Sequence, residues 1–162
     1  MATNEIYTDV LNAPFGELFI SATAFNVVAV SFSEKVNVKP NALTAEVKNQ
    51  LTAYFNGTLK IFDLPLKPKG TEFQKSVWNE LLNIPFGVSI TYLDLAKRLG
   101  NEKVIRASAS ANGKNPIPII IPCHRVIGSD NSLTGFSGGI ENKRWLLTHE
   151  KIISPDLLHL WV

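Results

Sequence analysis

The chain has little cysteine, methionine and histidine: one, one and three residues among 162. A single cysteine excludes an internal disulfide and a zinc site built from several cysteines, so we expect no metal and no need for an oxidising compartment. The longest apolar runs fall short of the roughly 18 residues of a membrane span, and MATNEIYTDV has no features of a secretion signal. We therefore expect a protein of the cytoplasm, or of the nucleus in a eukaryote, without membrane contact.

Apolar residues, by contrast, are plentiful. They make up 45% of the chain, including nine phenylalanines and three tryptophans, which is enough for one compact unit or two small ones. Charge is uneven: residues 1–67 contain five Lys against six acidic residues (net −1), and residues 68–150 contain ten Lys or Arg against seven (net +3). The second segment is the better partner for a polyanion, although basic surface residues more often serve solvation.

The first segment has the pattern of a small antiparallel sheet covered by a helix. Runs rich in β-branched and aromatic residues, EIYTDVL, GELFISAT and VVAVSF, are separated by NAPFG and AFN, as in a meander of strands. The stretch ALTAEVKNQLTAYF carries apolar residues on one helical face: Leu43, Val47, Leu51 and Tyr54.

Two prolines and a glycine in DLPLKPKG indicate a linker between patterned regions. We therefore expect an N-terminal α/β domain over residues 1–67, a second domain over residues 68–151, and a C-terminal tail over residues 152–162.

Helix signals dominate the second segment. Thr71 and Gln74 have the spacing of a capping box at the start of TEFQKSVWNELL. Thr91 and Asp94 repeat that spacing ahead of LAKRLG, and the glycine there predicts the end of the helix. A second helix over residues 102–112 follows at once. Two short helices joined across a glycine form a helix-turn-helix pattern, whose second helix commonly enters a groove of DNA.

This second helix, EKVIRASASAN, has unusually small side chains. After Arg106 it contains only alanine and serine as far as Ala111. A helix with its side chains is about 10–12 Å across and a B-form minor groove only about 6 Å wide, so a slim helix suits a groove that opens. An arginine such as Arg106 can fill the gap left by an extruded nucleotide or form an ion pair with a phosphate. The alternative is that the small residues permit close packing of the helix within the protein.

The one cysteine lies in the stretch IIIPCHR. A lone cysteine after an apolar strand is more often a small buried hydrophobe than a nucleophile. A thiolate at neutral pH requires a base or a cation nearby, and His124 and Arg125 are groups of these kinds. Because neighbours on a strand point to opposite faces, His124 serves Cys123 only if the backbone turns at the proline or a water bridges the two. Glu150 is the candidate carboxylate to orient the histidine.

The stretch NPIPIIIPCHRVIGSDNSLTGFSGGIENKRWLLTHE resembles the active-site region of the O6-alkylguanine-DNA alkyltransferases, also called methylated-DNA–protein-cysteine methyltransferases. The resemblance extends through FQKSVWNELLNIPFG, TYLDLAKRLG and VIRASASANGKNP, over essentially all of residues 71–150, and more weakly through APFGELFISAT. It implies a fold of the α/β (α+β) class: a ribonuclease-H-like N-terminal domain, with a small antiparallel sheet and a helix, and a mostly helical, winged-helix-like DNA-binding domain.

The activity implied by the resemblance is DNA repair. The alkyl group on guanine O6, and in some members on thymine O4, passes irreversibly to the protein's cysteine after the base has been rotated out of the duplex. Each molecule reacts once, and no cofactor is needed. The implied partner is double-stranded DNA containing O6-alkylguanine, bound through its minor groove by a monomer.

The matching positions imply the functional residues. Cys123 is the implied alkyl acceptor, His124 its base through a water, and Glu150 the carboxylate that orients the histidine, while Asn115 supports the turn. The residues implied in binding substrate or DNA are Tyr92, Arg106, Ala107, Ser108, Ala111, Arg125, Val126, Phe136 and Ser137. Tyr92 helps to rotate the nucleotide out and Arg106 fills the vacated stack. The backbone of Cys123 and Val126, with the Ser137 amide, reads the guanine.

Some features depart from the family pattern. Phe136 stands where the family often has tyrosine, and Ser108 and Ser110 lie where glycine is common. Both changes are expected to tune substrate choice. The segment after Lys151, IISPDLLHLWV, matches no part of the pattern.

Two other functions stay open on sequence alone. Alkyltransferase-like proteins bind alkylated DNA without repairing it, but have tryptophan in place of the cysteine. A cysteine hydrolase also combines thiol, imidazole and carboxylate, although it gives the slim helix no role.

Overall fold

The computed structural model describes residues 4–133 and 135–161. The chain forms two compact units: Met1–Lys69 with Pro116–Ile120, and Gly70–Asn115 with Ile121–Val162. The short segment Pro116–Ile120 thus belongs to the first unit, which the sequence pattern does not predict. The domain boundaries expected after residues 67 and 151 stay predictions.

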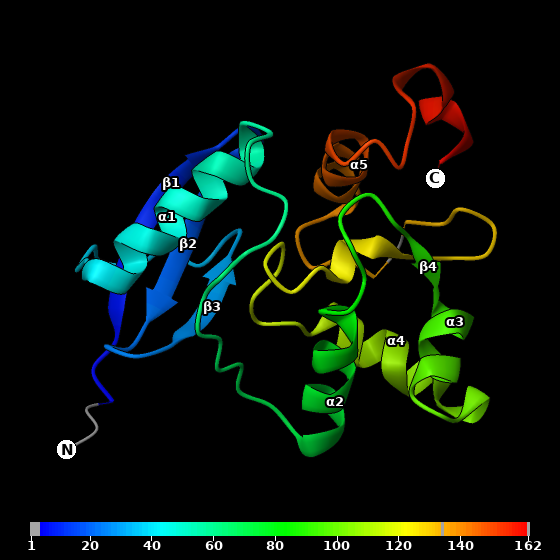
Figure 1. Ribbon diagram of the computed structural model, residues 1–162, viewed down its shortest axis with the longest axis horizontal. Coiled ribbons are helices and arrows are strands. Elements are labelled where there is room, and N and C mark those ends of the chain that lie inside the picture. The colour runs from blue at the N-terminus through cyan, green and yellow to red at the C-terminus, as the bar shows by residue number, and fades with distance from the viewer. Residues whose placement is uncertain (1–3, 134, 162) are drawn as a thin grey trace. The chain divides into compact units, whose positions relative to one another are not determined.

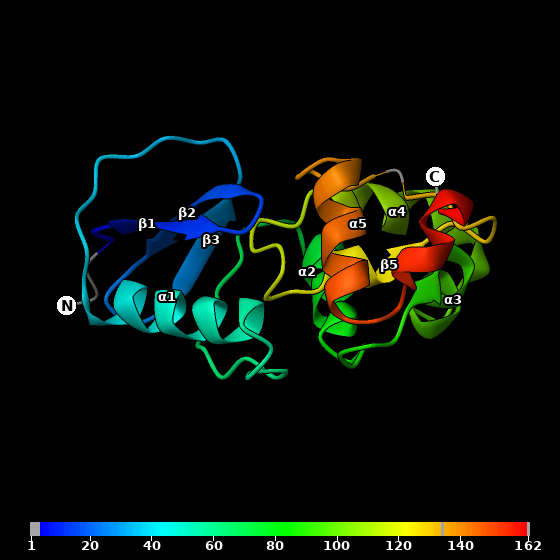
Figure 2. The ribbon, with the colours of Figure 1, turned by 90° about the horizontal axis from the view of Figure 1, so that it is seen from above.

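Unit 1 is a three-stranded antiparallel sheet with one helix packed on a face of it (Figures 1 and 2). The strands are β1 (Tyr7–Ala13), β2 (Gly16–Ala22) and β3 (Val27–Ser31), in the order β1-β2-β3. The register pairs Ala13 with Gly16, so the turn expected from NAPFG has two residues. The predicted meander is confirmed.

The helix of unit 1, α1, spans Ala42–Phe55. Its start is a capping box: the Thr44 amide donates to Asn41 Oδ1 at 2.8 Å, and the Asn41 amide donates to Thr44 Oγ1 at 2.9 Å. The chain leaves the helix at Gly57, whose φ of 81° suits glycine. The core of the unit consists of fully buried apolar residues from both layers: Leu18, Ile20, Val27, Val47, Leu51 and Tyr54.

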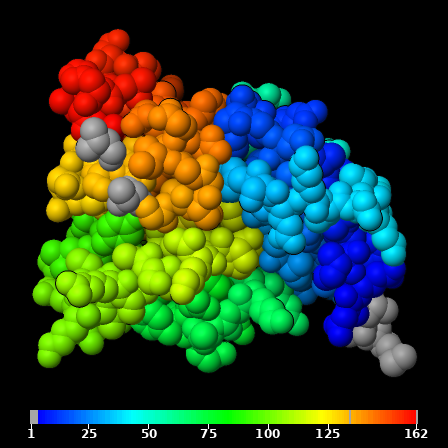
Figure 3. Space-filling model, turned by 180° about the vertical axis from the view of Figure 1, so that it is seen from behind, coloured from blue at the N-terminus to red at the C-terminus, as the bar shows by residue number. Residues whose placement is uncertain are grey.

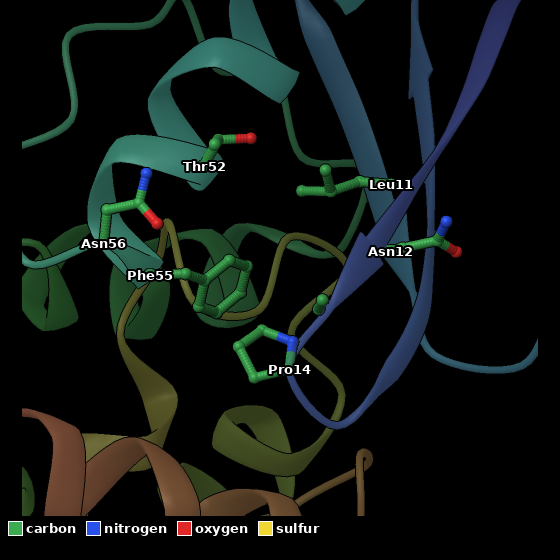
Figure 4. Close-up of a pocket in the computed structure, with 7 residues that line it drawn as sticks. Leu11, Asn12, Pro14, Thr52, Phe55 and Asn56 are labelled. Atoms are coloured by element: carbon green, nitrogen blue, oxygen red, sulfur yellow. The ribbon is translucent and has the colours of Figure 1, made fainter.

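A shallow hollow lies between the end of α1 and the β1–β2 hairpin (Figure 4). Its volume is about 270 Å³, and Phe55 and Pro14 form part of its apolar lining. Asn12 and Asn56 also line it, although the Asn12 carboxamide points away from Phe55 (Figure 4).

The isoleucine run does not form the strand that the sequence predicts. Ile119 has a φ of 74°, in the left-handed region that β-branched residues rarely adopt. Its side chain is fully buried, and the Pro116 carbonyl accepts a hydrogen bond from the Val30 amide at 2.9 Å. Burial and this contact with β3 offset the local strain, so the segment folds as a turn within unit 1.

Unit 2 is mostly helical (Figure 1). Its α-helices are α2 (Glu72–Leu81), α3 (Tyr92–Arg98), α4 (Ile105–Gly113) and α5 (Ile140–His149). Its 3₁₀ helices are η1 (Glu102–Val104), η2 (Cys123–Arg125) and η3 (Pro155–Leu160). Two short strands, β4 (Ile90–Thr91) and β5 (Val126–Ile127), pair in parallel.

The capping boxes predicted for α2 and α3 are confirmed. Thr71 and Gln74 exchange both hydrogen bonds, as do Thr91 and Asp94. The helix predicted over residues 102–112 instead begins as η1 and becomes regular only at α4. Trp78 of α2 donates its indole N–H to the Ala111 carbonyl at 2.8 Å, which joins α2 to the end of α4.

The C-terminal tail is part of the core of unit 2. Ile153 packs with Ile127, Leu133 and Leu147, and Ile152, Leu158 and Trp161 pack against this cluster. Figure 3 shows the tail, in red, beside the orange α5. No helix within residues 4–133 and 135–161 is long and apolar enough to cross a membrane.

The buried tail leads to a prediction about stability. Replacing the fully buried Ile153 by alanine should lower the free energy of unfolding by about 2–5 kcal/mol, because it leaves a cavity in the cluster. The exposed Leu160→Ala should change it by no more than about 0.5 kcal/mol. Urea denaturation measures both, and equal effects of the two changes would contradict the packing of the tail.

Candidate active site

The backbone turns at the cysteine. Cys123–Arg125 form η2, directly after Pro122 and before β5. The Cys123 amide donates to the Ile121 carbonyl at 2.8 Å, and the Arg125 amide donates to the Pro122 carbonyl at 3.0 Å. The turn that His124 needs in order to serve Cys123 is therefore confirmed, although the strand expected before it is absent.

His124 and Glu150 form a buried pair. His124 Nε2 lies 2.7 Å from Glu150 Oε2, and both side chains are fully buried. Because a carboxylate only accepts, Nε2 carries the hydrogen and Nδ1 is left as a lone-pair acceptor. His124 Nδ1 has no hydrogen-bond partner among the residues that the structure describes. Burial lowers the pKa of His124 although Glu150 opposes the effect, so the imidazole is neutral and able to take a proton.

Arg125 is directed into the protein. Its Nε donates to Glu150 Oε1 at 2.8 Å and its Nη2 to Glu150 Oε2 at 3.1 Å, while Nη1 donates to the Ile84 carbonyl at 2.6 Å. The family resemblance implies that Arg125 binds substrate or DNA, and its place beside Cys123 suggests a cation that lowers the thiol pKa. In the structure the residue is only 5% exposed, and its guanidinium is occupied by a buried, two-pronged ion pair with Glu150.

Glu150 is the common partner of this cluster. It caps the end of α5 and also accepts a hydrogen bond from the Gly87 amide at 3.2 Å. Burial alone would raise the pKa of this carboxyl, but the hydrogen bonds and charges of His124 and Arg125 lower it well below its usual value. Glu150 is therefore ionised over the whole physiological range.

The Cys123 thiol is protonated at rest. The residue is 2% exposed, and burial raises the pKa of the thiol to about 11. A hydrogen bond with Asn115, the charge of Lys143 and nearby backbone amides oppose that rise. A thiolate is thus not the resting form, and a base has to remove the proton during the reaction.

Lys143 is the cation near the thiol, and it is not among the residues expected from the sequence. It lies on α5, fully buried, with Nζ donating to the Val126 carbonyl at 2.6 Å and lying 5.9 Å from the centre of the Tyr92 ring. Burial lowers its pKa to about 8, opposed by Cys123. Its spacing is a usable signal: seven residues before Glu150 is two helical turns, so both share a face of α5.

Two asparagines hold the turn. Asn115, which the family resemblance suggests, donates its Nδ2 to the Ile121 carbonyl at 2.7 Å. Asn112, which sequence analysis did not single out, donates its Nδ2 to the Cys123 carbonyl at 3.3 Å. Both asparagine side chains are buried. One carboxamide therefore fixes the carbonyl of Ile121, before the turn, and the other fixes the carbonyl of Cys123, within it.

Tyr92 lies at the same site. It is the first residue of α3, and burial raises the pKa of its phenol, with a smaller contribution from Cys123. A Cβ added at Gly135 would lie 3.1 Å from the Tyr92 hydroxyl, so the loop approaches closely there. Beside Tyr92, an open cavity of about 490 Å³ is lined by residues of three segments: Thr91, Tyr92, Leu93, Ile105, Gly128, Ser129, Asp130 and Ser132.

The slim helix α4 has two different faces. Arg106 and Ala107 are exposed, as a contact with DNA requires. Ser108 and Ala111 are buried, and Ser108 Oγ donates to the Ile105 carbonyl at 3.0 Å. These two small residues pack closely within the protein, as in the alternative weighed for this helix, and their contact with DNA stays a prediction.

The remaining expected residues lie around the loop after the turn. Val126 is fully buried, with its carbonyl bound to Lys143; Phe136 is buried and Ser137 exposed. Within the part of the chain that the structure describes, no group of three His, Cys, Asp or Glu side chains is arranged to hold a metal ion.

The fold and the site define a class: a two-part α/β protein with a buried cysteine, histidine and glutamate beside a helix with an exposed arginine. Family models identify the class further. The DNA binding domain of 6-O-methylguanine DNA methyltransferase matches residues 72–152, and its ribonuclease-like domain matches residues 6–68. The chain belongs to this family, and its expected fold class is confirmed.

Individual relatives agree with the family models. A methylated-DNA–protein-cysteine methyltransferase of Methanosarcina acetivorans is 42% identical over 153 residues, which cover 90% of this chain and 98% of the relative. One of Haemophilus influenzae is 41% identical, with 91% and 87% covered.

Solved structures agree as well. An O6-methylguanine methyltransferase of Mycobacterium tuberculosis is 37% identical with a TM-score of 0.83, over 96% of this chain and 99% of that one. The OGT of the same bacterium, in complex with DNA, is 38% identical with a TM-score of 0.83, over 95% and 98%.

The buried carboxylate leads to a prediction about acid stability. Glu150→Gln should lower the free energy of unfolding at pH 7 by about 3–5 kcal/mol, because the Arg125 guanidinium loses its counter-charge. The pKa of Glu150 is depressed in the folded state, so its stabilisation is present above the unfolded value of about 4.3 and is lost as the pH falls below it.

Urea denaturation from pH 7 down to about pH 3 measures this difference. The wild-type protein should lose stability with acid more steeply than Glu150→Gln. The exposed Glu141→Gln on the same helix is the control and should behave as the wild type. The same acid dependence in wild type and Glu150→Gln would contradict the depressed pKa.

Proposed function

We propose that this protein repairs alkylated DNA by transferring the alkyl group from guanine O6 to Cys123 Sγ, once per molecule. The observation that carries this proposal is the turn of Cys123–Arg125, which joins the chain's one cysteine to a neutral histidine held by a buried glutamate. The proposed compartment is the one that holds the DNA: the cytoplasm, or the nucleus of a eukaryote.

The proposed partner is double-stranded DNA, bound by a monomer through the minor groove. The exposed face of α4 enters the groove, and the small Ala107 on that face allows the approach. Arg106 fills the stack that the extruded nucleotide leaves. Extrusion of a base costs a few kcal/mol, and the cost is lowest for a poorly paired base. A damaged guanine is therefore extruded in preference to a normal one. The related OGT structure in complex with DNA supports the binding of DNA.

The proton moves first. A water carries the thiol proton from Cys123 Sγ to His124 Nδ1, the buried acceptor atom. The imidazolium is stabilised by Glu150, which is ionised. The thiolate that forms lies near the ammonium of Lys143, whose charge opposes the cost of burying the anion.

The alkyl group then moves. The sulfur forms a bond to the alkyl carbon as the bond from that carbon to guanine O6 breaks, and the electron pair of the broken bond stays on the guanine. Tyr92, with its protonated phenol, donates a hydrogen bond to the leaving base. The proton on His124 finally passes to solvent and the guanine takes one up, so the products are an alkylated cysteine and an intact guanine.

The reaction is a single turnover. Alkylation converts the thiol into a thioether, which thiol exchange does not cleave. The chain has no second cysteine to take part in regeneration. Alkylated thymine O4 offers the same bond for attack and is the second candidate substrate.

Intact-protein mass spectrometry tests the proposal. Mixed with a short duplex containing O6-methylguanine, the protein should gain the mass of one methyl group and no more, however large the excess of duplex. Cys123→Ala should gain none. Unmodified protein that still binds the duplex would point to a protein that only recognises damage. Hydrolysis of an activated ester with repeated turnover would favour a cysteine hydrolase.

The buried ammonium leads to a prediction about rate. Lys143→Met should slow methyl transfer by about 10- to 100-fold at pH 7, because the forming thiolate loses its neighbouring charge. Wild-type transfer should also lose this assistance as the pH rises through about 8, where Lys143 loses its proton; the variant should not. Rapid-quench measurements at a series of pH values record both.

Affinity for the duplex is the companion measurement. Because Lys143 is fully buried, Lys143→Met should bind the duplex as tightly as the wild type in fluorescence anisotropy. The exposed Lys114→Met is the matched control and should leave the rate of transfer unchanged. Unaltered transfer by Lys143→Met would remove the lysine from the mechanism.

A further inference from the structure

Asn112 has one unused hydrogen-bonding atom at the active site. The residue lies near the end of α4 and is 1% exposed. Its Nδ2 donates to the Cys123 carbonyl, but its Oδ1 is buried and has no partner among residues 4–133 and 135–161. A buried polar atom without a partner costs about 1–3 kcal/mol and is rare in folded proteins. Its presence at a binding site therefore calls for a ligand that completes it.

The surroundings of Asn112 are groups that the reaction uses. Its carboxamide lies close enough to the Tyr92 phenol to lower the phenol's pKa, against the larger effect of burial. A Cβ added at the next residue, Gly113, would lie 3.0 Å from the Gly135 carbonyl, and one at Gly135 would lie 3.1 Å from the Tyr92 hydroxyl. Asn112 thus faces the place where α4, Tyr92 and the loop at Gly135 meet next to Cys123.

On the basis of the proposed function, we propose that Asn112 reads the 2-amino group of the extruded guanine. A carbonyl oxygen such as Oδ1 requires a donor. Alkylation at O6 removes the hydrogen from guanine N1, so the 2-amino group is the only N–H donor left on the base. The other end of the carboxamide holds the Cys123 carbonyl, so one side chain both positions the turn and contacts the substrate.

This contact selects guanine lesions over thymine lesions. In O4-alkylthymine the ring nitrogen N3 has lost its hydrogen, and the base has no N–H donor. Its entry would leave Asn112 Oδ1 buried and unpaired. A site built to hydrogen-bond one group rejects an analogue that lacks it, because the polar atom of the protein stays unsatisfied.

Two substrates that differ only in the 2-amino group test the proposal. One duplex contains O6-methylguanine and the other O6-methylhypoxanthine, which lacks that group. The second-order rate constant of methyl transfer should fall about tenfold or more for the wild type when the amino group is removed. In Asn112→Leu the fall should be at least about fivefold smaller, because the acceptor is gone. Asn112→Asp keeps an acceptor and should keep most of the discrimination, although transfer is slower overall.

The outcomes separate this proposal from the proposed function. A wild type that reacts equally with both duplexes overturns the assignment of Asn112, even if Asn112→Leu fails to fold, while leaving transfer to Cys123 intact. The same ratio of the two rate constants in wild type and Asn112→Leu also overturns it. Loss of a residue that only holds the turn would slow methyl transfer from both duplexes by the same factor. Thr148→Ala, which removes a half-buried hydrogen bond on α5, is the control and should leave the ratio unchanged. A wild type that takes no methyl group from O6-methylguanine would instead overturn the proposed function.

Discussion

The buried carboxylate of Glu150 is the interaction on which the rest of the site depends. It binds two adjacent side chains, His124 and Arg125, and two neighbours on an extended strand could not both reach it. The 3₁₀ turn of Cys123–Arg125 removes that obstacle. Arg125 also binds the Ile84 carbonyl and Gly87 binds Glu150, so the connection after α2, the turn and the end of α5 are held by one cluster. A buried charge that loses its partner destabilises the protein. The contacts that orient His124 therefore also contribute to the stability of unit 2.

A thiol with a raised pKa is compatible with a protein that reacts once. Thiolates are the form that oxidants and stray alkylating agents attack, so a cysteine kept protonated and buried is protected until its substrate arrives. The same site contains what the reaction requires: a neutral imidazole whose Nδ1 has no partner among the described residues, and an ammonium close to the sulfur. The anion therefore exists only during transfer, and its charge disappears when the thioether forms. The molecule is not regenerated by thiols, so resting inertness matters more here than resting reactivity.

Features that depend on residues a few positions apart are predictable from the sequence, whereas features that depend on contacts between distant residues are not. Capping boxes at Thr71 and Thr91 and the limits of α1 depend on residues a few positions apart, and the structure agrees with them. The left-handed conformation of Ile119 had no local signal, because it depends on burial of that side chain within unit 1. The inward direction of Arg125 follows from a carboxylate 25 residues away. Family resemblance indicates Glu150 and Asn115. Lys143 has a sequence signal only in its spacing from Glu150 on α5, and Asn112 has none, because its contact with the Cys123 carbonyl depends on how α4 packs against the turn.

In the proposed mechanism, helix α4 connects recognition of DNA with the chemistry through its own rigidity. Arg106 is exposed on one face, and Asn112, six residues later, is buried against the Cys123 carbonyl. Small residues between them let the helix pack closely within unit 2, where the Trp78 indole binds the Ala111 carbonyl beside Asn112. Because the helix is short and fixed at that end, a duplex that contacts its exposed face meets an arginine whose distance from the reactive turn is already set. Positioning of the lesion then needs no large rearrangement, and the cost of ordering these side chains is met during folding.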